Sequence, residues 1–218
     1  MQIGFLVFDG VTQLDFTGPL QVLSRAKDAT IHIVAKSMDP VSTDTPLTIP
    51  PTATVDTCPP LDILVIPGGH GVRQAMNDPV ITGFVATQSE TCQYLTSVCT
   101  GAFILGKAGF LYGKKATTHW AYTSFLEKVG ATYENARVVE DGNVITGGGV
   151  TAGIDFGFTL LARINGEDHA RAIQLAIEYD PGPPFDGGTP EKTAEAISAP
   201  IGDFYRKVGE EFAKELEA

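Results

Sequence analysis

The segment Tyr94–Gly106, YLTSVCTGAFILG, decides the fold of this chain. It starts as an apolar run of strand length, turns through small residues, and continues as an apolar run typical of a helix. Cys99 stands at the corner, where a side chain is usually aimed outward, whereas an inert cysteine packs in a core. The segment therefore predicts a strand, a nucleophile elbow and a helix, with a buried structural cysteine as the less favoured alternative.

The same alternation of strands and helices continues on both sides of the elbow. Apolar runs of strand length occupy Gln2–Phe8, Thr30–Lys36, Leu61–Pro67 and Cys92–Val98. Helical patterns lie between or after them at Leu20–Lys27, Pro79–Glu90 and Thr100–Ala108. Strands that alternate with helices favour right-handed crossovers and a mainly parallel sheet.

The second half of the chain adds shorter elements and a terminal arm. The pattern predicts a strand at Lys115–Thr118, a helix at Ala121–Val129, a hairpin of Arg137–Glu140 and Asn143–Thr146, and helices at Thr151–Arg163 and Asp168–Tyr179. A Pro/Gly-rich stretch, Asp180–Pro190, then leads to a charged helix at Glu191–Leu216. We expect one α/β domain over residues 1–180, and a connection and C-terminal helix over 181–218 that packs on the domain or on a partner subunit.

Composition argues against several classes of partner. The net charge of −11 on 218 residues disfavours nucleic acid, and less strongly anionic membranes. No apolar run approaches the roughly 20 residues of a membrane span. Three cysteines without paired spacing, and no signal-peptide pattern after Met1, predict a cytoplasmic location. No cluster of residues has metal-ligand spacing, so we expect no metal.

Three polar or glycine-rich segments follow predicted strands and should meet at one edge of the sheet. Asp15 follows the first strand, Gly68-Gly69 the third, and Cys99 the fourth. In an open parallel sheet, ligands bind beyond the carboxyl ends of the strands. The sequence therefore predicts a functional site formed by these three segments.

Cys99 is the predicted nucleophile. The helix after it would supply free N–H groups and a partial positive charge, and thiols so placed have pKa values lowered to about 3.5–7.5. The other two cysteines have no such setting. Cys58 lies in a connecting loop, and Cys92, at the start of the same predicted strand, would be roughly 23 Å from Cys99, too far for a disulfide.

Asp15 is the predicted proton shuttle. It lies between Leu14 and Phe16, where burial would raise the pKa of the carboxyl group toward neutrality. A helix N-cap is an equally supported interpretation, because aspartate is favoured there. Gly68-Gly69 presents backbone N–H groups to a substrate or forms a plain tight turn. His119 is the histidine that sequence logic would pair with Cys99, although spacing alone does not establish this. The glycines at 147–149 suggest a backbone packed closely beside the elbow.

The chain resembles the DJ-1/PfpI superfamily, and within it the bacterial isocyanide hydratases. The resemblance rests on the segments QLDFTGP, IPGGHGV, SVCTG, TTHW and GGGVTAGIDFG, and reaches QLAIEYDPGPPF. It implies a single-domain, flavodoxin-like sandwich with helices on both faces of a mainly parallel sheet. It also implies catalytic roles for Cys99, Asp15 and Thr100, where PfpI-type peptidases have a histidine in place of Thr100. The pocket residues that it implies are Gly68, Gly69, His119, Trp120, Gly148 and Val150.

The function implied by the resemblance is addition of water to an isocyanide, R–N≡C, to give the N-substituted formamide. Cys99 would form a thioimidate and Asp15 would act as general acid and base, with no cofactor. The family resemblance also implies a homodimer. The alternatives are a glyoxalase-like or deglycase-like enzyme and a cysteine-based redox or ligand sensor.

Overall fold

Five parallel strands form the centre of the sheet in this computed structural model, which describes residues 1–217. They are β1 (Gln2–Leu6), β2 (Thr30–Ala35), β6 (Ile63–Ile66), β7 (Tyr94–Val98) and β11 (Val144–Gly147). Their spatial order is β2-β1-β6-β7-β11. This is the flavodoxin-like order, in which the chain reverses direction across the sheet beside the first strand. The predicted fold class is confirmed.

Short strands complete the sheet at its two edges. β5 (Ala53–Thr54) pairs in parallel with β2, and β10 (Val138–Asp141) pairs antiparallel with β11. The predicted hairpin around Asp141-Gly142 is therefore confirmed. All four residues of β6 and of β11 are buried. Strands covered by helices on both faces require this uninterrupted burial.

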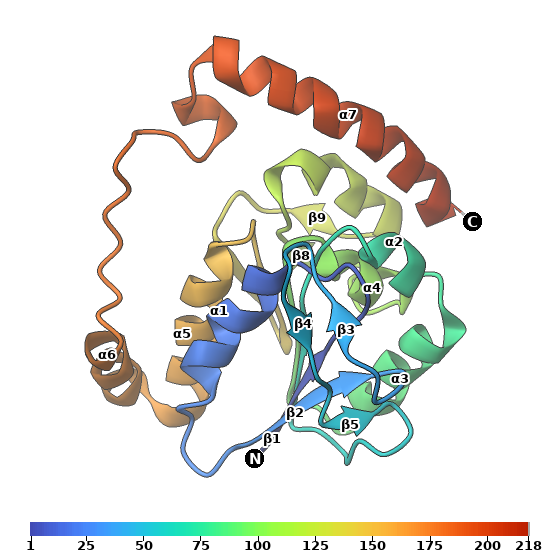
Figure 1. Cartoon of the computed structure of the whole chain (residues 1–218), viewed down its shortest axis with the longest axis vertical. Helices are drawn as coiled ribbons and strands as arrows, with labels where there is room; N and C mark the ends of the chain where they lie inside the picture. Colours follow the sequence, from blue (N-terminus) through green and yellow to red (C-terminus); the bar gives the residue numbers. More distant parts are fainter. Residues whose placement is uncertain (218) are drawn as a thin grey trace.

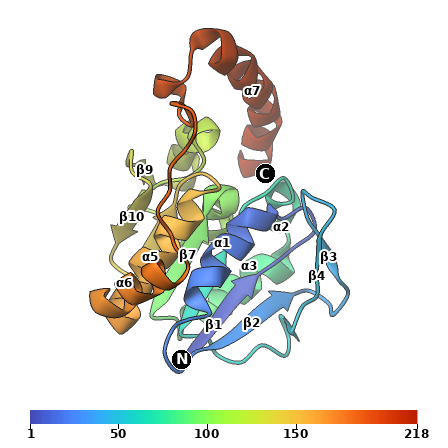
Figure 2. The same cartoon turned by 60° about the vertical axis from the view of Figure 1, so that its left-hand side comes forward.

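Helices cover both faces of the sheet (Figures 1 and 2). α1 (Gln13–Leu23) and α5 (Ala152–Asn165) lie together on one face, with α6 (Glu167–Ala176) beside α5. α3 (Pro79–Ser89) and α4 (Ala102–Lys107) lie on the other face, next to the short α2 (Val72–Ala75). The core between the layers contains fully buried Phe5, Phe103 and Phe156.

The first helix begins seven residues before the predicted Leu20 and ends at Leu23, because tertiary packing outweighs an interior Gly-Pro pair. Proline within a helix removes a hydrogen bond and costs about 3 kcal/mol. Here Gly18 and Pro19 are buried at the crossing with α5, where a Cβ on Gly153 would lie 3.3 Å from Pro19 Cδ. The early start places Asp15 in the first turn, after an N-cap at Thr12, so the N-cap interpretation of Asp15 was wrong.

Other differences concern short or irregular elements. The predicted helix at Ala121–Val129 is a 3₁₀-helix, η2 (Trp120–Val129), which ends at the left-handed Gly130. The strand predicted at Lys115–Thr118 is the two-residue β8 (Lys115–Ala116), paired with β9 (Thr132–Tyr133). No sequence pattern predicted β9 or the pair β3 (Val41–Ser42) and β4 (Thr48–Ile49). Elements of two residues are too short to show periodicity.

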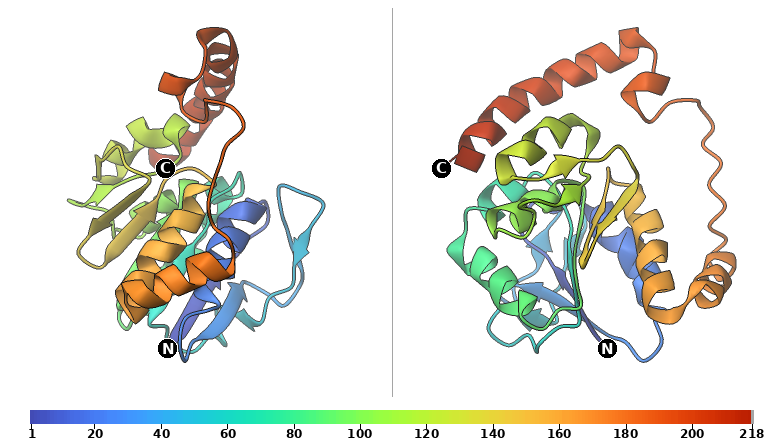
Figure 3. Two further views of the ribbon diagram at one scale, coloured as in Figure 1. Left: turned by 90° about the vertical axis from the view of Figure 1, so that its left-hand side faces the viewer. Right: turned by 180° about the vertical axis from the view of Figure 1, so that it is seen from behind.

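The C-terminal arm runs along the outside of the molecule before it returns to the domain. After α6, an extended segment leads to the 3₁₀-turn η3 (Pro190–Lys192) and to α7 (Glu195–Glu217). Figures 1 and 3 show α7 passing across η2 toward α2. The terminal helix therefore begins at Glu195 rather than Glu191. Within residues 1–217, no helix combines the length and apolar character needed to cross a membrane.

Candidate active site

The three predicted segments meet at the carboxyl ends of β1, β6 and β7, and hydrogen bonds connect them. The Gly68 N–H donates to Asp15 Oδ2 at 2.9 Å. The Gly69 N–H donates to Thr100 Oγ1 at 3.0 Å. A Cβ on Gly68 would lie within 2.8 Å of both Thr100 and Asp15. Glycine is needed here because the loop after β6 touches the other two segments through its backbone.

The elbow itself holds Cys99 in a strained conformation. Its φ of +57° lies in the left-handed region, which non-glycine residues rarely adopt and which clusters at functional sites. A Cβ on Gly101 would lie only 2.2 Å from the Ile66 carbonyl oxygen, so the sharp turn requires a glycine after the nucleophile position. This geometry agrees with the elbow expected from the SVCTG sequence.

Two segments predicted from the sequence brace the elbow from the other side. The Cys99 N–H donates to the Gly148 carbonyl at 2.9 Å, and Thr118 Oγ1 donates to the Cys99 carbonyl at 2.7 Å. The glycine run at 147–149 therefore lies directly against the elbow, as its composition indicated. Thr118 is 3 % exposed, and its supporting role was not predicted from the sequence.

Asp15 is fully buried, and burial raises the pKa of its carboxyl group from 3.8 to about 7. The hydrogen bond from Gly68 and the interaction with the Cys99 thiol act in the opposite direction but are weaker. Its second oxygen, Oδ1, is buried without a hydrogen bond of good geometry. The carboxyl group therefore exchanges a proton near neutral pH, as the sequence predicted from its apolar neighbours.

The pKa of the Cys99 thiol is raised well above its ordinary value, contrary to the sequence prediction. The causes are burial, then the charge of Asp15; hydrogen bonds from the Thr100 backbone and hydroxyl lower the pKa but are outweighed. The element that follows is a single 3₁₀ turn, Cys99–Gly101, and then the six residues of α4. Near neutral pH the thiol is therefore protonated while the carboxyl group releases its own proton, so the thiolate forms by proton transfer to the Asp15 carboxylate.

A cavity of about 360 Å³ opens at the elbow. Its lining includes four of the predicted residues, Gly69, His119, Val150 and Thr100, together with Cys99. The predicted pocket residues Trp120 and Gly148 line a neighbouring hollow instead, and Gly68 lies behind the cavity against Asp15. The lining residues that the sequence analysis did not assign are Thr12, His70, Tyr122, Phe204, Tyr205 and Val208.

These omissions have different causes. His70 directly follows the glycine pair, and no motif in the sequence gives it a role. Phe204 and Tyr205 belong to α7, far along the chain from the elbow, and their position depends on how the arm folds back. An aromatic pair on an amphipathic helix is a weak signal of a binding site, because most such pairs belong to a core.

His119 faces the cavity as a neutral imidazole. Burial lowers its pKa from 6.5 to about 4. Its Nδ1 accepts a hydrogen bond from the Ala121 N–H at 3.3 Å, and its ring packs against Tyr205 with centroids 5.1 Å apart. Both interactions orient the ring as a wall of the cavity. The described residues show no hydrogen bond between His119 and Cys99, so the Cys99 thiol contacts Asp15 rather than a histidine.

Metal ligands do not gather at this site. Over residues 1–217, no three His, Cys, Asp or Glu side chains are placed to hold an ion. All three cysteines are free thiols.

The DJ-1/PfpI family matches residues 1–163, three quarters of the chain. The chain belongs to the DJ-1/PfpI family. The fold is shared with DJ-1 from Schizosaccharomyces pombe, 22% identical over 81% of this chain and 98% of that chain, with a TM-score of 0.72.

Two other similar proteins match a larger part of this chain. An isonitrile hydratase from Pseudomonas putida is 49% identical over 90% of this chain and 86% of its own length. A crystal structure of a ThiJ/PfpI family protein from Pseudomonas syringae has a TM-score of 0.93 and 42% identity, and covers 99% of this chain and 88% of that chain. The second similarity includes the C-terminal arm.

Proposed function

We propose that this protein is an isocyanide hydratase that converts R–N≡C and water to the N-substituted formamide. Isonitrile and isocyanide name the same group, so the Pseudomonas putida relative, at 49% identity, supports the assignment. The observation that carries it is the buried carboxyl group of Asp15 against the Cys99 thiol. The reaction needs one nucleophile and one group that moves a proton near neutral pH, and this pair supplies both.

The first half of the reaction forms a covalent intermediate. Asp15 takes the Cys99 proton as Sγ attacks the terminal carbon of the isocyanide. The S–H bond breaks, the S–C bond forms, and Asp15 delivers the proton to that carbon. The product is a thioimidate, Cys–S–CH=N–R. The isocyanide carbon is now bonded to Cys99 Sγ, which Asp15 contacts, so the proton moves only a short distance from Asp15 to that carbon.

The second half releases the formamide. Asp15 accepts one proton from water as the oxygen attacks the thioimidate carbon, and it then passes this proton to the nitrogen. The tetrahedral intermediate, S–CH(OH)–NH–R, then collapses: the C=O bond forms, the C–S bond breaks, and the hydroxyl proton moves through Asp15 to sulfur. One isocyanide and one water give one formamide, and the enzyme regains its thiol. Thr100 donates to the sulfur and stabilises the thiolate that leaves in this step.

The test is formamide production from cyclohexyl isocyanide. We expect turnover by the native chain and a loss of at least a hundredfold in Cys99→Ala and in Asp15→Asn, which corresponds to about 2.7 kcal/mol of barrier. Cys58→Ala and Asp28→Asn are matched controls that should retain activity, since both positions lie outside the cavity. A folded native chain without turnover would contradict the proposal, and the same variants would then be tested on glyoxals.

The burial of Cys99 counts against the sensor alternative. The residue is only 6 % exposed, and its thiol pKa is raised. Redox-sensing cysteines are accessible and have low pKa values.

We also propose that the chain forms a homodimer, as the family resemblance led us to expect. The first half of α7 leaves Ile197 and Ile201 exposed by 59% and 44%, which gives a second copy an apolar surface to cover. Light scattering after gel filtration should give twice the chain mass of 23.1 kDa, and a monomer mass would contradict the dimer. The cytoplasmic location, the absence of a cofactor and the division at residue 180 stay predictions from the sequence.

A further inference from the structure

One wall of the Cys99 cavity comes from the C-terminal helix. The loops after β1, β6, β7 and β11 contribute Thr12, Gly69, Cys99 and Val150. α7 contributes Phe204, Tyr205 and Val208, all apolar or aromatic. The strand-end loops thus supply the reacting groups, whereas the arm supplies the apolar surface that faces them.

The carboxyl-terminal half of α7 is anchored to the domain. Phe212 and Leu216 are buried, and the Phe212 ring packs on Phe103 with centroids 4.8 Å apart. The Arg73 guanidinium donates to both oxygens of Glu215 and to Glu211. This half of the helix is therefore held by a buried aromatic contact and an ion-pair network.

Aromatic rings hold the cavity-facing part of the helix. Tyr205 contacts His119, Trp120 and Tyr122, with centroid distances of 5.1, 5.4 and 6.0 Å. Phe204 packs edge-on against Tyr205 at 5.4 Å and is 61% exposed, so its ring stands at the mouth of the cavity.

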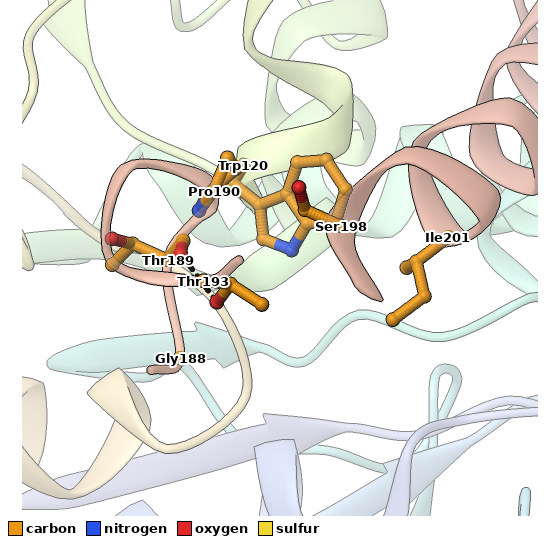
Figure 4. Close-up of a pocket in the computed structure, with 7 residues that line it drawn as sticks. All are labelled: Trp120, Gly188, Thr189, Pro190, Thr193, Ser198 and Ile201. Carbon is orange, nitrogen blue, oxygen red and sulfur yellow. Dashed lines mark hydrogen bonds between the residues drawn. The ribbon is translucent and has the colours of Figure 1, made fainter. Parts of the chain in front are cut away.

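A further hollow, distinct from the one lined by Trp120 and Gly148, lies where the arm approaches Trp120. Figure 4 shows the Trp120 side chain between the connecting segment at Thr189 and Pro190 and the α7 residue Ser198. Trp120 thus serves as the surface on which the returning arm is seated. It belongs to the support of the wall rather than to the Cys99 cavity itself.

The lining of the Cys99 cavity carries no fixed charge. Among the described residues that form it, none is Asp, Glu, Lys or Arg, and burial keeps His119 neutral at physiological pH. A charged substituent would lose its hydration, and the described lining offers it no Asp, Glu, Lys or Arg side chain as a partner. The volume of about 360 Å³ lies near the lower end of the range for ligand sites, which suits a substituent the size of a single ring.

We propose that Phe204 and Tyr205 of α7 bind the R group of the isocyanide and select neutral apolar rings over small or charged substituents. This inference rests on the proposed function, because it places the isocyanide carbon at Cys99 and the R group against α7. The two residues determine specificity and do not take part in proton transfer.

The test compares Phe204→Ala with the native chain on cyclohexyl isocyanide and methyl isocyanide. Phe204 is largely exposed in the single chain, so its truncation should leave the fold of the chain intact. Because Phe204 lies on the same face of α7 as Ile197 and Ile201, light scattering must also give Phe204→Ala the same mass as the native protein. We expect kcat/KM for the cyclohexyl substrate to fall about five- to tenfold through a higher KM, the range of a lost ring contact. The methyl substrate should change less than twofold. Phe185→Ala is the matched control, because Phe185 is 83% exposed on the connecting segment and lines none of the described cavities.

A second measurement separates this proposal from the proposed function. Calorimetry with the products, N-cyclohexylformamide and N-methylformamide, reports binding without turnover. The native chain should bind the cyclohexyl product more tightly, and Phe204→Ala should lose that preference. An equal loss for both R groups, no loss in Phe204→Ala, or the same loss in Phe185→Ala overturns the proposal. Absence of turnover with the binding preference intact overturns only the isocyanide chemistry.

Discussion

Replacement of Asp15 by asparagine should make the protein more stable at neutral pH while it abolishes activity. Burial raises the pKa of this carboxyl group from 3.8 to about 7. Between these two values the unfolded chain has released the proton, whereas the folded chain still holds it. Stability from this group is therefore fully present below about pH 4 and is lost as the pH rises to about 7.

The magnitude follows from the size of the shift. A difference of about three pKa units, at 1.36 kcal/mol each, corresponds to about 4 kcal/mol of unfolding free energy. Asparagine keeps the shape of the side chain, and its amide oxygen accepts the Gly68 N–H bond that Asp15 Oδ2 accepts now. Relative to the native chain, Asp15→Asn should gain up to about 4 kcal/mol between pH 4 and pH 8.

Urea unfolding at pH 5, 6, 7 and 8 measures this difference. The free energy gap between Asp15→Asn and the native chain should widen by about 1 kcal/mol per pH unit up to pH 7 and then level off. Asp28→Asn, on the exposed surface, should show no such slope. In a Cys99→Ala background, the gap between chains with and without Asp15→Asn should widen with pH in the same way. The reason is that the Cys99 thiol lowers rather than raises the pKa of Asp15. A gap that stays constant over this pH range would show that burial does not raise the pKa of Asp15 above the effect of its hydrogen bonds.

Three further predictions concern the elbow and the cavity. Gly68→Ala places a Cβ 2.6 Å from the Thr100 nitrogen, so we expect a loss of about 1–3 kcal/mol in urea unfolding and at least tenfold lower turnover. Thr118→Val leaves the Cys99 carbonyl without its 2.7 Å donor and should cost about 1–3 kcal/mol; Thr123→Val, which removes a longer, half-buried bond to the Trp120 carbonyl, is the control, and equal stabilities would contradict this role. Isocyanoacetate should show at least tenfold lower kcat/KM than its methyl ester, since the lining of the cavity offers its carboxylate no Lys or Arg, and equal values would contradict the selection against charged substituents.

Local sequence patterns predicted the elements that carry the chemistry. Apolar runs followed by glycine or polar residues marked the ends of β1, β6 and β7, and the parallel topology brings those ends to one edge of the sheet. Small residues around Cys99 predicted the sharp turn, because only glycine at 101 fits against the Ile66 carbonyl. Both inferences depend on backbone sterics between near neighbours, which a sequence records directly.

The start of α1 was beyond such reasoning. A Gly-Pro pair at 18–19 normally ends or breaks a helix, and the pattern therefore suggested that the helix begins after it. The crossing with α5 reverses this preference, since Gly18 and Pro19 allow the two helices to approach closely. The position of Asp15 within the helix follows from that contact and not from its own capping preference.

Sequence by itself determined the sharp turn at Cys99, the parallel sheet and the meeting of the Asp15 and Cys99 segments at one edge of it, because each depends on local backbone geometry and strand order. Tertiary structure alone decided the protonation of the pair and the apolar wall of the cavity. The thiol pKa rises rather than falls because burial and the neighbouring Asp15 outweigh the hydrogen bonds at the turn. Phe204 and Tyr205 reach the cavity because the arm folds back across η2. Desolvation and long-range packing depend on residues distant in the chain, so no local pattern encodes them.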